Sequence, residues 1–205
     1  MTENQPLFER LAHNISAHGF SIHPNGLPKD LGNMLRNQFR QTSTSKFRKA
    51  GTGRHGDFKV NATIRRDEIL WIDDTSEAGA AWLMWMAAMR DFLNQRLFLG
   101  LSSFESHFAH YRKGDFYRKH EDAFRGEGNR ILSVVTYLNA DWLATDGGEL
   151  VLFPQSKEEL AIKVEPKLGT FVAFLSEEFP HEVLTTHRDR LSIAGWFRLN
   201  TAVPL

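Results

Sequence analysis

Three residues in the second half of the chain have the types and spacing of metal ligands. His120 and Asp122 are two positions apart, so in extended backbone both side chains leave the same face of a strand and can reach one cation. His181 follows Pro180 at the start of another predicted strand and can supply a third ligand. Two imidazoles and one carboxylate on one face of an octahedron form the ligand set of non-heme Fe(II) oxygenases. A lone His-x-Asp pair arises easily by chance, so this prediction depends on the surrounding motifs.

Arg190 is the first of those surrounding features. It begins the last predicted strand, with Ser192 and Ala194 on the same face. A guanidinium beside small residues suits a carboxylate co-substrate held by two parallel hydrogen bonds. The residue could equally be a surface arginine in the charged turn 187–190, and the pattern alone does not decide between these interpretations.

The other histidines have ordinary explanations, and we expect none of them to be a metal ligand. His13, His18, His23 and His55 lie in polar or helical segments that we expect at the surface. His107 and His110 fall on opposite faces of one predicted strand, and His187 lies in a turn.

The elements that must position these residues change character halfway along the chain. In the first hundred residues, helical patterns cover 7–15, 27–39 and 76–97, a strand is predicted at 64–72, and the polar, basic stretch 42–61 reads as a long loop or mobile hairpin. Short β-branched and aromatic runs then follow at 104–111, 130–139, 149–153, 161–164, 170–176, 182–186 and 191–199. We therefore predict an α+β, mainly β fold, a jelly-roll core with N-terminal helices packed on one sheet. Residues 1–205 would form a single domain, with 1–100 as helical support and 101–200 as the core.

Composition excludes several other classes of protein. The chain has 205 residues and no cysteine, which rules out disulfide frameworks, thiol catalysis and iron–sulfur clusters. Its 25 basic and 25 acidic residues cancel, so we expect no nucleic-acid partner. The longest apolar run, residues 78–89, is too short to span a bilayer, and the first residues lack an apolar signal segment. We expect a cytoplasmic protein without a membrane partner.

Taken together, the motifs of residues 110–197 resemble the 2-oxoglutarate- and Fe(II)-dependent oxygenases of the prolyl hydroxylase type. The matching segments, in order, are 120–122, 135–139, 141–142, 147–150, 153–154, 171–176, 180–183 and 190–196. Residues 64–72, Ile-Arg-Arg-Asp-Glu-Ile-Leu-Trp-Ile, resemble a strand of the EGL-nine group of oxygen-sensing prolyl hydroxylases and their bacterial members.

This resemblance implies a double-stranded β-helix and a role for each matching residue. His120, Asp122 and His181 match the Fe(II) ligands, and Arg190 and Tyr137 match the residues that bind the distal carboxylate of 2-oxoglutarate. Tyr111 matches a tyrosine near the metal end of that co-substrate. The implied reaction uses O2, hydroxylates a prolyl residue of a protein and releases succinate and CO2, with ascorbate as a candidate reductant of the iron. Tyr117 also matches a family tyrosine, for which we expect a structural role.

The resemblance to bacterial prolyl hydroxylases points to a proline in a translation protein, with elongation factor Tu as the leading candidate. We expect the basic residues of the 42–61 stretch, Lys46, Arg48, Lys49, Arg54 and Lys59, to form a flap that grips the substrate. Three alternatives stay open: the same chemistry on a small metabolite, an alkylated-base demethylase, and a cupin-like binding module without redox chemistry. Demethylases carry a second arginine six residues after the first, whereas this chain has Trp196 there.

Overall fold

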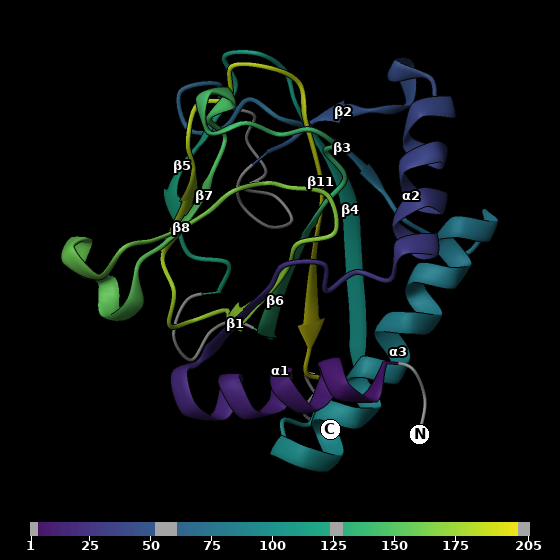
Figure 1. Cartoon of the computed structure of the whole chain (residues 1–205), viewed down its shortest axis with the longest axis vertical. Coiled ribbons are helices and arrows are strands. Elements are labelled where there is room, and N and C mark those ends of the chain that lie inside the picture. The colour runs from purple at the N-terminus through teal and green to yellow at the C-terminus, as the bar shows by residue number, and fades with distance from the viewer. Residues whose placement is uncertain (1–3, 52–60, 124–128, 201–205) are drawn as a thin grey trace, which may run out of the picture.

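The strands of the protein form two antiparallel sheets that pack face to face (Figure 1). The computed structural model describes residues 4–51, 61–123 and 129–200. The larger sheet has the strand order β1-β9-β6-β11-β4-β3-β2, and the smaller has the order β5-β10-β7-β8. Most neighbours in these sheets are not consecutive in sequence, so strands from distant parts of the chain lie side by side as in a jelly roll. The predicted mainly β fold with a double-stranded β-helix core is confirmed.

The described residues contain three α-helices and eleven strands. The helices are α1 (Gln5–His18), α2 (Lys29–Gln41) and α3 (Glu77–Leu97), with short 3₁₀ helices at Thr44–Lys46, Ala144–Asp146, Pro154–Ser156 and Glu158–Leu160. The strands of the larger sheet are β1 (Phe20–His23), β2 (Arg48–Lys49), β3 (Glu68–Trp71), β4 (Ser103–Tyr111), β6 (Arg130–Tyr137), β9 (Phe171–Leu175) and β11 (Arg190–Arg198). Those of the smaller sheet are β5 (Tyr117–His120), β7 (Leu150–Leu152), β8 (Ile162–Val164) and β10 (His181–Val183).

The helices cover the outer face of the larger sheet, as the sequence predicts (Figure 1). Ser76 is the N-cap of α3, and its hydroxyl accepts a hydrogen bond from the backbone N–H of Gly79 at 3.0 Å, which caps the first turn. The helix buries Trp82, Met86 and other large side chains against the sheet. A second apolar cluster lies between the two sheets. The larger sheet therefore carries apolar side chains on both faces. Its outer face packs on the helices, and its inner face, turned toward the smaller sheet, can form a site.

Several local predictions differ from the structure. The strand predicted at 64–72 is shorter, since β3 covers only Glu68–Trp71, and the short edge strand β1 was not predicted. The stretch 42–61 contains a 3₁₀ helix and β2, which pairs with β3 as one arm of a hairpin. Its residues Arg54, His55 and Lys59 lie outside the described residues. His23, expected at the surface, is buried, and its Nε2 lies 2.7 Å from the Ser21 hydroxyl.

Within the described residues, no helix combines the length and apolar character needed to cross a membrane.

Candidate metal centre and co-substrate pocket

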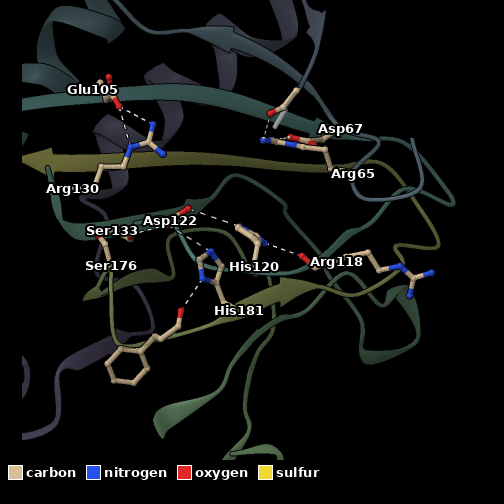
Figure 2. Close-up of polar contacts among 12 residues, drawn as sticks. Arg65, Asp67, Glu105, Arg118, His120, Asp122, Arg130, Ser133, Ser176 and His181 are labelled. Carbon is tan, nitrogen blue, oxygen red and sulfur yellow. Dashed lines mark hydrogen bonds and ion pairs between the residues drawn. The ribbon is translucent and has the colours of Figure 1, made fainter. Parts of the chain in front are cut away.

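His120, Asp122 and His181 converge at one place in the barrel (Figure 2). One potential ligand atom from each residue lies within 4.8 Å of the other two. The two histidines come from paired strands of the smaller sheet, where His181 of β10 is in register with His120 of β5. The prediction that both His120 and Asp122 lie in one strand is wrong, because β5 ends at His120 and Asp122 occupies the bend that follows. The bend still brings the carboxylate oxygens within 3.8 Å of His120 Nε2 and 3.6 Å of His181 Nε2.

Backbone carbonyls orient both imidazoles. His120 Nδ1 lies 2.8 Å from the carbonyl oxygen of Arg118, and His181 Nδ1 lies 3.0 Å from that of Phe179. A neutral imidazole that donates from Nδ1 has a lone pair on Nε2, so both rings present a metal-binding atom to the shared centre. The His181 ring also packs against Phe174 in an edge-to-face arrangement.

The electrostatics of the cluster suit a divalent cation. Burial, followed by the neighbouring His181, lowers the pKa of His120 to about 3. Burial alone would raise the pKa of Asp122, but the adjacent His181 and His120 and the Ser133 hydroxyl outweigh it and lower this pKa to about 2. At neutral pH the site therefore holds an unprotonated His120 and an ionised carboxylate, the forms that ligate a metal.

A stack of side chains behind His120 gives Tyr117 a clearer place than the sequence provided. The Tyr117 and His120 rings are stacked, with centroids 3.5 Å apart and an interplanar angle of 12°. The Arg65 guanidinium lies 4.3 Å from the Tyr117 centroid and forms hydrogen bonds of 2.8 and 2.6 Å with both oxygens of the buried Asp67 (Figure 2). This Arg65–Asp67 pair supports the stack, and the sequence assigned the two residues no individual role.

Arg190 is buried within the barrel, which excludes the alternative of a surface arginine. It is 1% exposed, and its Nε donates to the carbonyl oxygen of Gly148 at 2.8 Å and its Nη1 to the hydroxyl of Ser192 at 3.0 Å. The guanidinium carbon lies 5.1 Å from the ring centroid of Tyr137, and the buried Tyr137 hydroxyl has no hydrogen-bond partner among the described residues. A buried cation beside an unsatisfied hydroxyl is a binding arrangement for a carboxylate.

Tyr111 lies on the same inner face, opposite Arg190 in the register of β4 and β11. The Arg190 guanidinium carbon is 4.8 Å from the Tyr111 ring centroid. Burial raises the pKa of Tyr111 well above its usual value, and it raises that of Tyr137 to about 12, so both phenols stay protonated as hydrogen-bond donors. All six residues singled out in the sequence thus belong to one barrel interior.

A separate cavity of about 310 Å³ lies on the other face of the larger sheet and includes none of these six residues. It is bounded by α2, the segment after it, and the neighbouring strand ends, including Arg36, Phe39, His110 and Leu191.

Comparisons with known proteins identify what the chain resembles. Residues 106–198 match the family described as the 2OG-Fe(II) oxygenase superfamily. The crystal structure of a Pseudomonas putida prolyl-4-hydroxylase is 41% identical, with a TM-score of 0.86, covering 95% of this chain and 100% of that one. A Trichoplax adhaerens prolyl hydroxylase, solved in complex with a peptide fragment of the hypoxia inducible factor oxygen degradation domain, is 25% identical, with a TM-score of 0.82 over 96% of this chain and 90% of that one.

Longer relatives match as well. Egl nine homolog 1 from Homo sapiens is 28% identical over 195 residues, which cover 89% of this chain and 44% of that protein. The chain therefore spans less than half the length of this curated relative.

Proposed function

The chain belongs to the 2OG-Fe(II) oxygenase superfamily, and on that premise we propose that it is a prolyl hydroxylase acting on a protein substrate. The observation that carries the proposal is the 41% identity to a bacterial prolyl-4-hydroxylase along that protein's whole chain. The likeness to a prolyl hydroxylase solved with a bound peptide supports a polypeptide substrate.

In this proposal His120, Asp122 and His181 hold Fe(II). The donor set fits this metal, because two imidazoles and a carboxylate leave part of the coordination sphere open for co-substrates. The unprotonated His120 and the ionised Asp122 are ready to bind a cation at neutral pH. When bound, Fe(II) supplies the redox chemistry that reduces O2 at the expense of 2-oxoglutarate and a substrate C–H bond.

Arg190 and Tyr137 bind the distal carboxylate of 2-oxoglutarate. Arg190 forms a charge-assisted hydrogen bond, and the Tyr137 hydroxyl donates a second one that has no competing partner among the described residues. We assign Tyr111, by the family resemblance, to the metal end of the same co-substrate. Both phenols remain donors because burial raises their pKa values. Fixing the co-substrate at both ends reduces the entropy lost when the reacting groups meet.

The overall reaction consumes one O2 and one 2-oxoglutarate for each proline hydroxylated. One oxygen atom enters succinate as 2-oxoglutarate loses CO2, and the other becomes the hydroxyl group of the product. Ascorbate is the proposed reductant when iron is oxidised without substrate turnover.

We propose elongation factor Tu as the first substrate to test, because the resemblance is to bacterial members of the family. A translation factor as substrate places the enzyme in the cytoplasm.

Incubation of the Fe(II)-loaded protein with its host lysate, with and without 2-oxoglutarate, tests the proposal. Succinate is quantified, and mass spectrometry locates peptides that gain one oxygen. We expect a hydroxylated proline in one protein, elongation factor Tu first among the candidates. A gained oxygen on a different protein would replace only the named substrate. Succinate without any modified protein would assign the enzyme to a small-molecule substrate. If the iron-loaded protein forms neither succinate nor a modified peptide, that result would contradict the oxygenase activity itself.

A further inference from the structure

The three proposed metal ligands are held by different kinds of support. His120 and His181 lie in paired strands, and each ring is fixed by a backbone carbonyl. Asp122 lies beyond the end of β5, outside any strand ladder. Its carboxylate must therefore be oriented by contacts from elsewhere in the fold.

Two serine hydroxyls from the larger sheet make such contacts (Figure 2). Ser133 of β6 donates to Asp122 Oδ2 at 2.6 Å, and its oxygen lies 2.9 Å from the hydroxyl of Ser176, directly after β9. Ser133 is 1% exposed and Ser176 is fully buried, so water does not compete for either hydroxyl. The pairing of β6 with β9 brings the two serines together although they are far apart in sequence.

The charge of Asp122 sets the direction of both hydrogen bonds. An ionised carboxylate only accepts, so Ser133 must give its proton to Asp122, and its oxygen is then left to accept from Ser176. Each bond in such a chain polarises the next and strengthens it. The short distance of 2.6 Å agrees with a charge-assisted hydrogen bond.

We propose that Ser133 and Ser176 form a hydroxyl relay that positions Asp122 for metal binding. They are positioning residues, since neither belongs to the proposed ligand set and Ser133 acts through Asp122. The relay joins the carboxylate ligand to the larger sheet, whereas both imidazoles belong to the smaller sheet, so it sets the position of one ligand relative to the other two. This inference rests on the proposed metal site and not on the identity of the protein substrate.

A matched pair of variants tests the role of the hydroxyl. Ser133→Thr and Ser133→Val add side chains of nearly equal volume, but only threonine keeps the hydroxyl. Affinity for Co(II), a redox-stable stand-in for Fe(II), is measured by calorimetric titration of the metal-free protein, without 2-oxoglutarate or substrate. We expect Ser133→Val to bind Co(II) about 10- to 100-fold more weakly than Ser133→Thr, the loss usual for the outer partner of a metal ligand. Ser176→Ala should lose less, because the bond from Ser133 to Asp122 remains.

Two controls separate positioning from general damage to the fold. Ser106→Ala removes another buried hydroxyl, which accepts a hydrogen bond from Trp82 Nε1 at 3.0 Å, and should lower thermal stability without changing Co(II) affinity. His120→Ala should abolish tight binding; if it does not, the metal site itself is wrong. Equal Co(II) affinities for Ser133→Val and Ser133→Thr, with His120→Ala impaired, would overturn the relay and leave the metal site standing. If Ser133→Val fails to fold, a Ser176→Ala affinity equal to that of wild type would overturn it.

Discussion

At the scale of single residues, the Tyr137 hydroxyl is the group in the proposed 2-oxoglutarate site that is free to bind a carboxylate. It is buried and unsatisfied among the described residues, so Tyr137→Phe removes no internal hydrogen bond in that part of the chain. We expect the melting temperature to stay unchanged or to rise slightly. The affinity for 2-oxoglutarate should fall about tenfold, since a hydrogen bond to a charged group contributes roughly 1.5 kcal/mol or more.

Calorimetric titration of 2-oxoglutarate into the metal-loaded wild type and variant checks this. The control is Phe108→Leu, which truncates a fully buried ring on the outer face of the larger sheet and should cost stability but not tenfold in affinity. Equal affinities for wild type and Tyr137→Phe would remove Tyr137 from the co-substrate site.

His107 should make the protein sensitive to acid. Burial, with a smaller contribution from the Arg65 guanidinium, lowers the pKa of His107 to about 4. Below pH 6.5 the unfolded chain therefore binds a proton that the folded chain refuses, so the free energy of unfolding falls as the pH drops. The loss from this one group approaches 2 kcal/mol at pH 5, at about 1.36 kcal/mol per pH unit.

Urea unfolding of the metal-free wild type and His107→Gln at pH 7, 6 and 5 measures this loss. The wild type should lose stability more steeply, and the difference in slope belongs to His107 because other groups are common to both proteins. His13→Gln, at an exposed position on α1, should run parallel to wild type. A His107→Gln curve that also runs parallel would mean that the imidazole is not held neutral.

At the level of elements, two helix glycines look alike in sequence but differ in their surroundings. A Cβ on Gly79 of α3 would lie 2.1 Å from the backbone carbonyl oxygen of Asp73, which cannot move aside cheaply. A Cβ on Gly32 of α2 would meet only the flexible Leu27 side chain, at 3.2 Å. Alanine is favoured over glycine inside a helix by about 1 kcal/mol, so the clash decides the sign at Gly79.

We expect Gly79→Ala to destabilise the protein by about 1–3 kcal/mol and Gly32→Ala to be neutral or stabilising by up to about 1 kcal/mol. Thermal and urea unfolding of the two variants check this directly. If Gly79→Ala also stabilises the protein, helix propensity, rather than the approach of Asp73, controls this position.

On the scale of the whole molecule, the proposed metal and 2-oxoglutarate connect the two sheets, because the residues that bind them come from both. The proposed metal ligands His120 and His181 belong to the smaller sheet, and Arg190 and Tyr137 belong to the larger one. A ligand that binds only the folded state stabilises it by about 2.7 kcal/mol at one hundred times its Kd. We therefore expect Co(II) with 2-oxoglutarate to raise the melting temperature by about 5–10 °C.

Differential scanning fluorimetry with and without both ligands measures this shift, and a chelator should reverse it. His120→Ala supplies the control, because it retains Arg190 and Tyr137 but lacks one metal ligand. A wild type that gains no stability from the ligands, or a His120→Ala protein that gains as much, would contradict a site shared between the sheets.

Much of the site could be predicted because it depends on local properties. Residue type identified His120, Asp122, His181 and Arg190 as candidates, and motif order indicated their roles. Short runs of β-branched and aromatic residues predicted most strands, and the apolar pattern of residues 76–97 predicted α3. These signals are short-range, since the period of a strand or helix is written in consecutive residues.

Other features were decided only by the tertiary structure. Whether Arg190 lies inside the barrel depends on the pairing of β11 with β4 and β6, and the burial of His107 depends on the same packing. The strand β1 is too short to give a recognisable sequence pattern, and it forms because it pairs with β9 at the edge of the larger sheet.

The contacts that hold the proposed metal ligands were likewise decided only by the tertiary structure. A serine on a predicted strand carries no sign of the carboxylate it will meet, although its polar type at an inward position of β6 was a clue. Ser133 meets Asp122 and Ser176 because β5, β6 and β9 are brought together by the topology of two packed sheets. The sequence by itself determined which groups could do chemistry, whereas the structure decided what holds them, because contacts between distant residues follow from strand order and not from local pattern.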